Sequence, residues 1–164
     1  MIERYAVVAA RIRQELVELE PLVARAQRAV SSARQRPEDQ DLYLDSAALN
    51  LHDFYTGLER IFYHIATNVD GSVPVTREWH RELLRQMGMA LPQVRPEVLS
   101  PETIKALDEY LRFRHVVRNV YAFEFEPERI ERLVKQLRQC FDGVRDELLA
   151  FAGFLDLLAQ EDEQ

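Results

Sequence analysis

The residues best suited to chemistry lie close together in the segment 111–121, LRFRHVVRNVY. This segment carries three arginines, a histidine, an asparagine and a tyrosine, and residues 110–122 contain no acidic residue. In a chain of net charge −7, such a segment is a concentrated cationic patch. Arginine donates bidentate hydrogen bonds to phosphate oxygens, and histidine exchanges a proton near neutral pH. The segment therefore predicts an anion site that suits a phosphate.

On a helical wheel, the polar residues of this segment share one arc, with Tyr121 at its border. The residues of this polar arc are Arg112, Arg114, His115, Arg118 and Asn119. The opposite arc is predicted to face the core and holds Ala106, Tyr110, Phe113, Val116, Val117 and Val120. Leu107 and Leu111 fall near Arg118, where they would pack against a neighbouring helix or a second chain. An alternative interpretation is a solvated helix face whose arginines pair with acidic residues of neighbouring helices.

Helices must position this segment, because apolar residues recur at spacings of three and four through most of the chain. They predict long helices over residues 2–35, about 37–69, 101–121 and 127–158, and a short helix over 77–88. Pro21 is expected to kink the first helix, and Ser100 to cap the fourth, with Pro101 at its first position. No strand pattern of useful length is present. The sequence thus predicts one all-α domain over residues 1–164, an up-and-down bundle of four main helices plus one short helix.

The first and last helices carry the longest apolar seams. The first seam is Ile12, Leu16, Leu19, Val23, Ala26 and Val30, and the last is Val134, Leu137, Phe141, Val144, Leu148, Phe151, Leu155 and Leu158. The seams could pack against each other or against a second copy of the chain, and packing within one chain is the favoured interpretation.

Composition excludes several classes of protein. An acidic chain is a poor general nucleic-acid binder, so an RNA role would need the local patch. Charges interrupt the first twenty residues too often for a signal peptide or a membrane span. Cys140 is the only cysteine, which rules out an internal disulfide and suits a cytoplasmic location. It lies beside an apolar seam and is predicted to be a small core residue.

Cofactor and metal motifs are also missing from the sequence. It has no glycine-rich phosphate loop, no HExxH, and no histidine with a glutamate three residues before it. We therefore expect neither a cofactor nor a metal site. His52 and His64 lie beside aromatic residues in the second helix and are predicted to be structural or surface residues.

At the 111–121 segment the chain resembles the HEPN superfamily and, within it, the HepT-like toxins. Those proteins carry an arginine, often a polar residue next, then three residues, a histidine, one residue and a tyrosine. Arg114, His115 and Tyr121 take the arginine, polar and tyrosine positions, whereas Asn119 stands where the family has its histidine. The stretches LHDFYTGLERIF (51–62) and WHRELL (79–84), with Met87, resemble the second helix and the short third helix of a HepT-like subgroup. The resemblance covers about residues 45–140.

The resemblance implies a dimerising helical bundle that cleaves RNA without a metal, the ribose 2′-OH attacking the adjacent phosphorus. Arg114 would stabilise the charge that develops, and Arg112 and Arg118 would hold flanking phosphates. The resemblance also implies a cognate minimal nucleotidyltransferase antitoxin that attaches AMP to Tyr121. A bulky anionic group there would block RNA entry and neutralise the arginines.

Asn119 leaves three hypotheses open, because an amide cannot exchange a proton near neutral pH. In the first, His115, about 40° from Asn119 on the same arc, takes over as the base of a toxin endoribonuclease. In the second, the protein is a non-catalytic HEPN-type binding protein, a partner or substrate-binding subunit of a nucleotidyltransferase. In the third, it is an unrelated helical bundle with an interaction role.

Overall fold

The computed structural model describes residues 2–119 and 126–162, and among them every regular element is a helix. The elements are α1 (Ile2–Gln35), the 3₁₀ turn η1 (Pro37–Asp39), α2 (Gln40–Ile65), the π-helical turn η2 (Ala66–Asp70), α3 (Trp79–Met87), α4 (Pro101–Asn119) and α5 (Pro127–Glu161). The prediction of an all-α bundle with four main helices and one short helix is confirmed. The predicted last turn of the fourth helix, at residues 120–121, lies outside the described residues, as do residues 122–125 of the gap between the predicted fourth and last helices.

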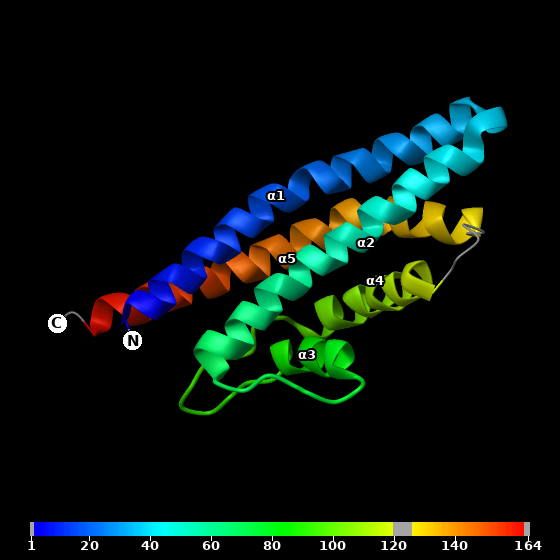
Figure 1. The fold of residues 1–164 in the computed structure, drawn as a ribbon. Helices are drawn as coiled ribbons and strands as arrows, with labels where there is room; N and C mark the ends of the chain where they lie inside the picture. Colours follow the sequence, from blue (N-terminus) through cyan, green and yellow to red (C-terminus); the bar gives the residue numbers. More distant parts are fainter. Residues whose placement is uncertain (1, 120–125, 163–164) are drawn as a thin grey trace.

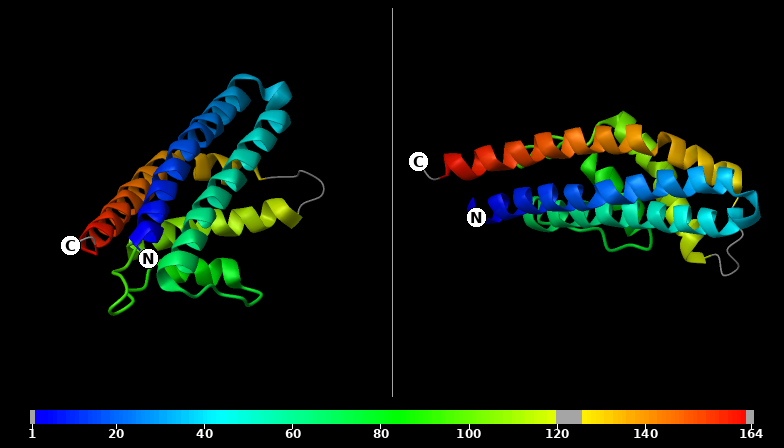
Figure 2. Two further views of the ribbon diagram at one scale, coloured as in Figure 1. Left: turned by 60° about the vertical axis from the view of Figure 1, so that its left-hand side comes forward. Right: turned by 90° about the horizontal axis from the view of Figure 1, so that it is seen from above.

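The long helices follow one another in alternating directions, as an up-and-down bundle requires (Figure 1). α1, α2 and α5 lie side by side, whereas α4 and the short α3 cover one side of them (Figures 1 and 2). None of the described helices combines the length and the apolar composition that crossing a membrane requires.

The seams of α1 and α5 are buried within this one chain. All six apolar residues predicted for the first seam are buried, and so are those of the last seam up to Leu155, whereas Leu158 is half-buried. α1 continues through Pro21 without a break. A Cβ at Gly57 of α2 would overlap the side chain of Leu19, so a glycine is needed where α1 and α2 approach. Packing within one chain, the favoured interpretation, is therefore confirmed.

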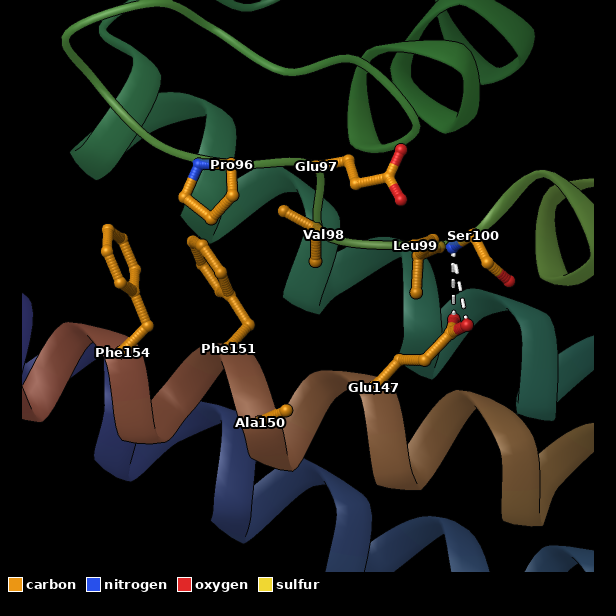
Figure 3. Close-up of a pocket in the computed structure, with 9 residues that line it drawn as sticks. All are labelled: Pro96, Glu97, Val98, Leu99, Ser100, Glu147, Ala150, Phe151 and Phe154. Atoms are coloured by element: carbon orange, nitrogen blue, oxygen red, sulfur yellow. Dashed lines mark hydrogen bonds between the residues drawn. The ribbon is translucent and has the colours of Figure 1, made fainter.

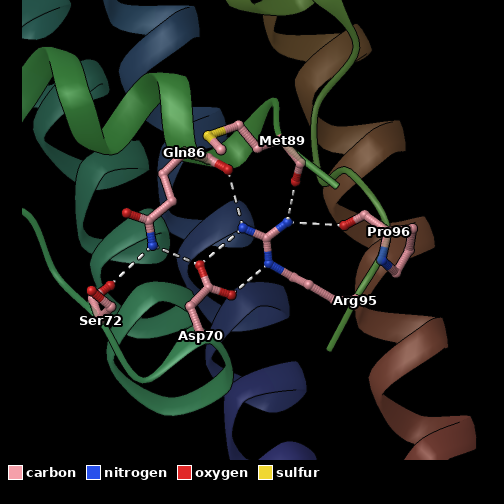
Figure 4. Close-up of polar contacts among 6 residues, drawn as sticks. All are labelled: Asp70, Ser72, Gln86, Met89, Arg95 and Pro96. Carbon is pink, nitrogen blue, oxygen red and sulfur yellow. Dashed lines mark hydrogen bonds and ion pairs between the residues drawn. The ribbon is translucent and has the colours of Figure 1, made fainter. Parts of the chain in front are cut away.

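A buried ion pair holds the loop between α3 and α4 against the end of α2. The chain leaves η2 through Gly71, whose φ of 74° belongs to the left-handed region that glycine adopts readily. The neighbouring Asp70 accepts two hydrogen bonds from Arg95, of 2.5 Å from Nε and 2.9 Å from Nη2 (Figure 4). Arg95 also donates to the backbone carbonyls of Gln86, Met89 and Pro96. These contacts fix the loop that leads into α4.

The start of α4 is set by a cap and by a contact with α5. Ser100 Oγ accepts a hydrogen bond from the Thr103 amide at 3.2 Å, which confirms the predicted N-cap. The Ser100 amide lies 3.3 Å from both carboxylate oxygens of Glu147 on α5, where residues 96–100 pass across that helix (Figure 3). A serine cap contributes about 1 kcal/mol, so both contacts fix where α4 begins.

The core-facing side of α4 is rotated from the predicted arc. Leu107 and Leu111 are buried, whereas Ala106, which was predicted to face the core, is exposed, so that prediction is wrong. The physical reason is that α4 packs against both α2 and α5 and therefore buries two flanks. Tyr110 marks this junction: its ring contacts Phe54 of α2 edge-on, and its hydroxyl donates to the carbonyl of Leu133 on α5 at 2.7 Å. The rotation carries Arg114 toward α2.

Candidate functional site

Arg114 does not lie on an open helix face but reaches inward to α2. Only 12% of its side chain is exposed. Its Nε donates to Thr56 Oγ1 at 3.1 Å, and its Nη1 lies 3.5 Å from Oε1 of the buried Glu59. Because Thr56 and Glu59 are three residues apart on a helix, they share the face of α2 that meets α4. Two helices thus hold the guanidinium in place.

His80 completes this cluster from α3. Its Nδ1 lies 2.7 Å from Oε2 of Glu59 and 3.1 Å from Nη1 of Arg114. The indole of Trp79 stacks on the imidazole, with ring centroids 3.6 Å apart and planes inclined by 30°. We call Thr56, Glu59, His80 and Arg114 the Arg114 cluster. It joins three helices through one buried carboxylate.

His80 and Arg114 of this cluster form part of the wall of a surface groove of about 480 Å³, which we call the cationic groove. Its lining residues are Arg77, Glu78, His80, Arg81, Leu111, Arg112, Arg114, His115, Val116 and Arg129. Five arginines and two histidines thus face one glutamate in the lining. Guanidinium groups bind phosphate oxygens through paired hydrogen bonds, so the groove is suited to a phosphodiester or another anion.

Acidic partners on α4 and aromatic rings orient the arginines of the groove. Asp108 accepts from Arg81 at 2.8 Å and lies 3.2 Å from Nε of Arg112. The guanidinium of Arg129 lies over the ring of Phe113, 5.6 Å from its centroid, a cation–π geometry. The alternative interpretation of arginines paired with acids of neighbouring helices holds for Arg114, which pairs with Glu59 of α2, whereas the partner of Arg112 lies on α4 itself. Both nevertheless line the groove.

A buried tyrosine lies close to the Arg114 cluster. Burial raises the pKa of Tyr55 far above its usual value, and the charge of Glu59 raises it further. Its hydroxyl has no hydrogen-bond partner within the described part of the chain. Tyr55 is therefore a neutral phenol and not a base.

Three of the six predicted site residues, Arg112, Arg114 and His115, line the cationic groove. Arg118 and Asn119 belong to α4, but their side chains lie outside the described residues, as does the whole of Tyr121.

Cys140 is partly buried, and burial raises the pKa of its thiol to about 12. Cys140 packs against the core, in agreement with the prediction. Its raised pKa also disfavours the thiolate, which is the reactive form of cysteine.

His80 and Glu59 were not predicted from the sequence as site residues, and neither were the groove arginines Arg77, Arg81 and Arg129. A search for glutamate and histidine at fixed spacing on one helix could not pair Glu59 with His80, because they come from different helices and lie 21 positions apart. The available signal was the WHRELL stretch, which includes Trp79, His80 and Arg81. Among the described residues, no group of three or more His, Cys, Asp or Glu side chains is arranged to hold a metal ion.

The bundle and the groove define a class, an all-α protein in which arginine and histidine side chains of α4 line a cationic groove. A comparison with family models then gives the family. The chain belongs to the HepT-like family of the HEPN superfamily, since the model described as HepT-like protein matches residues 46–155. The resemblance inferred from sequence is thus confirmed. Searches of curated proteins and of solved structures returned no match.

Proposed function

We propose that this protein is a toxin-type endoribonuclease that cleaves RNA without a metal. One observation carries the proposal: Arg114, the first residue of the HepT-like motif, lies in a groove with four more arginines and two histidines. Family membership supports a toxin-type function, and the groove is suited to the phosphates of an RNA strand.

The reaction requires a base, an acid and a cation at the phosphorus. His115 removes the proton of the 2′-OH, and the 2′ oxygen forms a bond to the adjacent phosphorus. The bond from phosphorus to the 5′ oxygen breaks, which leaves a 2′,3′-cyclic phosphate and a 5′-OH. Arg114 stabilises the phosphorane, Arg112 and Arg118 hold flanking phosphates, and Asn119 donates a hydrogen bond that orients the substrate.

Charge distribution supports an RNA ligand in spite of the acidic chain. The net charge of −7 opposes RNA binding in general, so affinity must come from local contacts. Arginines from four parts of the chain line the groove. They are Arg77 of the α2–α3 loop, Arg81 of α3, Arg112 and Arg114 of α4, and Arg129 of α5. An extended strand can contact several of them at successive phosphates.

The test is cleavage of RNA by purified, partner-free protein in the presence of a chelator. Wild type is expected to cut, and Arg114→Ala to lose nearly all activity. Arg145→Ala is the matched control, because Arg145 pairs with Glu20 and Asp142 outside the groove. Equal cleavage by wild type and Arg114→Ala would overturn the proposal.

Within the same proposal, a cognate minimal nucleotidyltransferase neutralises the protein by attaching AMP to Tyr121, and two copies of the chain form a dimer. The added phosphate would bring negative charge to the arginines. Incubation with the partner and ATP should increase the mass of the chain by one adenylate, and Tyr121→Phe should abolish that increase. Sedimentation of the purified chain tests the dimer.

Asn119 favours a second candidate, a non-catalytic HEPN-type subunit that binds RNA or its nucleotidyltransferase without cutting. This candidate predicts a stable complex with the partner, no toxicity on expression, and no cleavage by wild type. The cleavage assay therefore separates the two functions.

A further inference from the structure

His80 has the geometry of a proton-transfer group, although it lies outside the motif of α4. It contacts Arg114 at 3.1 Å and lines the same groove as His115. About 23% of its side chain is exposed, so the ring is held by the protein and still reaches solvent. Two histidines and an arginine around one groove are the set of groups that RNA transesterification requires.

Glu59 determines which nitrogen of His80 can exchange a proton with a ligand. A carboxylate only accepts hydrogen bonds and a guanidinium only donates them, so Nδ1 of His80 cannot bond to Glu59 and to Arg114 at the same time. The contact with Oε2 of Glu59, 2.7 Å, is shorter than the 3.1 Å contact with Nη1 of Arg114 and favours a proton on Nδ1. Nη1 of Arg114 approaches Oε1 of the same carboxylate at 3.5 Å, so two donors converge on one buried acid. Nε2 is then the nitrogen left for chemistry. Stacking on Trp79 fixes the plane of the ring.

We propose that His80 is the general acid of the cleavage reaction, with Glu59 as its positioning residue. The inference rests on the proposed ribonuclease function. In this role His80 reacts in its imidazolium form, with Nδ1 directed at Glu59. As His115 takes the 2′-OH proton and the 2′ oxygen bonds to phosphorus, the bond to the 5′ oxygen breaks. Nε2 of His80 donates its proton to that oxygen, the 5′-OH leaves, and solvent restores both histidines.

This assignment explains how the site can work with Asn119 at the histidine position of the motif. An asparagine cannot supply a proton, but a histidine from α3 can. Arg114 contacts Glu59 and also lines the groove, where its role is to stabilise the phosphorane. The second proton-transfer group therefore comes from a different helix.

The experiment compares two RNA substrates that differ at one atom of the mapped cleavage position. One carries the normal 5′ oxygen, and the other carries sulfur there, a leaving group that needs no proton. His80→Ala and His80→Gln should lose about 10²–10⁴-fold in rate on the oxygen substrate and recover most of that loss on the sulfur substrate. Arg114→Ala should remain impaired on both, because its role is at the phosphorus.

His52→Ala is the matched control, since His52 is another carboxylate-paired histidine with 23% of its side chain exposed. Thermal unfolding followed by circular dichroism checks that each variant is folded. Equal loss on both substrates, or no loss at all, would overturn the role of His80 and leave the ribonuclease intact. No cleavage of either substrate by wild type would overturn both.

Discussion

Two arginines of this protein are each paired with a buried carboxylate, yet their surroundings differ. Arg95 and Asp70 are 0% and 1% exposed, and five hydrogen bonds from Arg95 reach Asp70 and three carbonyls (Figure 4). Arg114 and Glu59 are 12% and 8% exposed, and they meet at a longer distance of 3.5 Å. The Asp70–Arg95 pair is fully enclosed by protein, whereas Arg114 and His80 of the Arg114 cluster line the groove.

The difference separates a structural use of arginine from a functional one. A guanidinium whose donors all point at protein atoms fixes the backbone and has nothing left for a ligand. A guanidinium at the wall of a groove keeps its charge available to an incoming phosphate. The same pairing of arginine with an acid therefore holds a loop in one place and prepares a site in the other.

The largest expected effect is on stability, at Arg95. Arg95→Ala leaves Asp70 charged and buried without its partner, which costs about 3–5 kcal/mol. Chemical denaturation measures this loss in the free energy of unfolding. Arg138→Ala, which removes a more exposed pair with Glu20, is the control and should cost at most about 1 kcal/mol. Similar losses in the two variants would contradict the distinction.

The next effect is on activity, at Arg114. Arg114→Lys keeps a positive charge but loses the paired donors, and we expect cleavage to fall about 10²–10³-fold, as for a lost transition-state donor. Its free energy of unfolding should fall less than that of Arg95→Ala, because His80 still contacts Glu59. Rates and unfolding curves for both variants test this order. A stability loss at Arg114 that matched Arg95 would make both clusters structural.

A smaller effect should appear in the salt dependence of RNA binding. Arg112 is more than half exposed in the groove, so Arg112→Ala should remove one phosphate contact. The slope of log affinity against log salt concentration should then fall by about 0.7 for a single strand. Filter binding at several salt concentrations measures it. Arg145→Ala, outside the groove, should leave the slope unchanged.

The smallest effect concerns the buried hydroxyl of Tyr55. Tyr55→Phe removes a group that has no hydrogen-bond partner among the described residues, so the free energy of unfolding should stay the same or rise by about 1 kcal/mol. Denaturation measures the change. A clear loss of stability would mean that the hydroxyl of Tyr55 makes a stabilising hydrogen bond, and would contradict this prediction.

Local sequence rules accounted for much of the fold. Apolar spacing placed the helices, and Ser100 marked the start of α4. A single-helix wheel could not show that α4 is buried on two flanks, so it placed Ala106 in the core and left Leu107 and Leu111 on the polar side. Which side chains are buried depends on the helices that pack against a given helix, and the sequence of one helix does not show which helices these are.

The site was predictable only where its residues share one helix. Arg112, Arg114 and His115 follow each other along α4, so their spacing revealed them. Glu59 and His80 reach the same place from α2 and α3, and only the packing of three helices brings them to Arg114. Contacts between elements therefore complete a site that one motif only begins.

The most direct test of the central claim is the chemistry of the RNA ends that the protein produces. Purified protein with a chelator is incubated with an RNA and with its 2′-O-methyl analogue, and the products are analysed by mass spectrometry. The account predicts 2′,3′-cyclic phosphate and 5′-OH ends from the RNA, none from the analogue, and none from either with Arg114→Ala. Cleavage of the analogue, or an intact RNA after incubation with wild type, would contradict it.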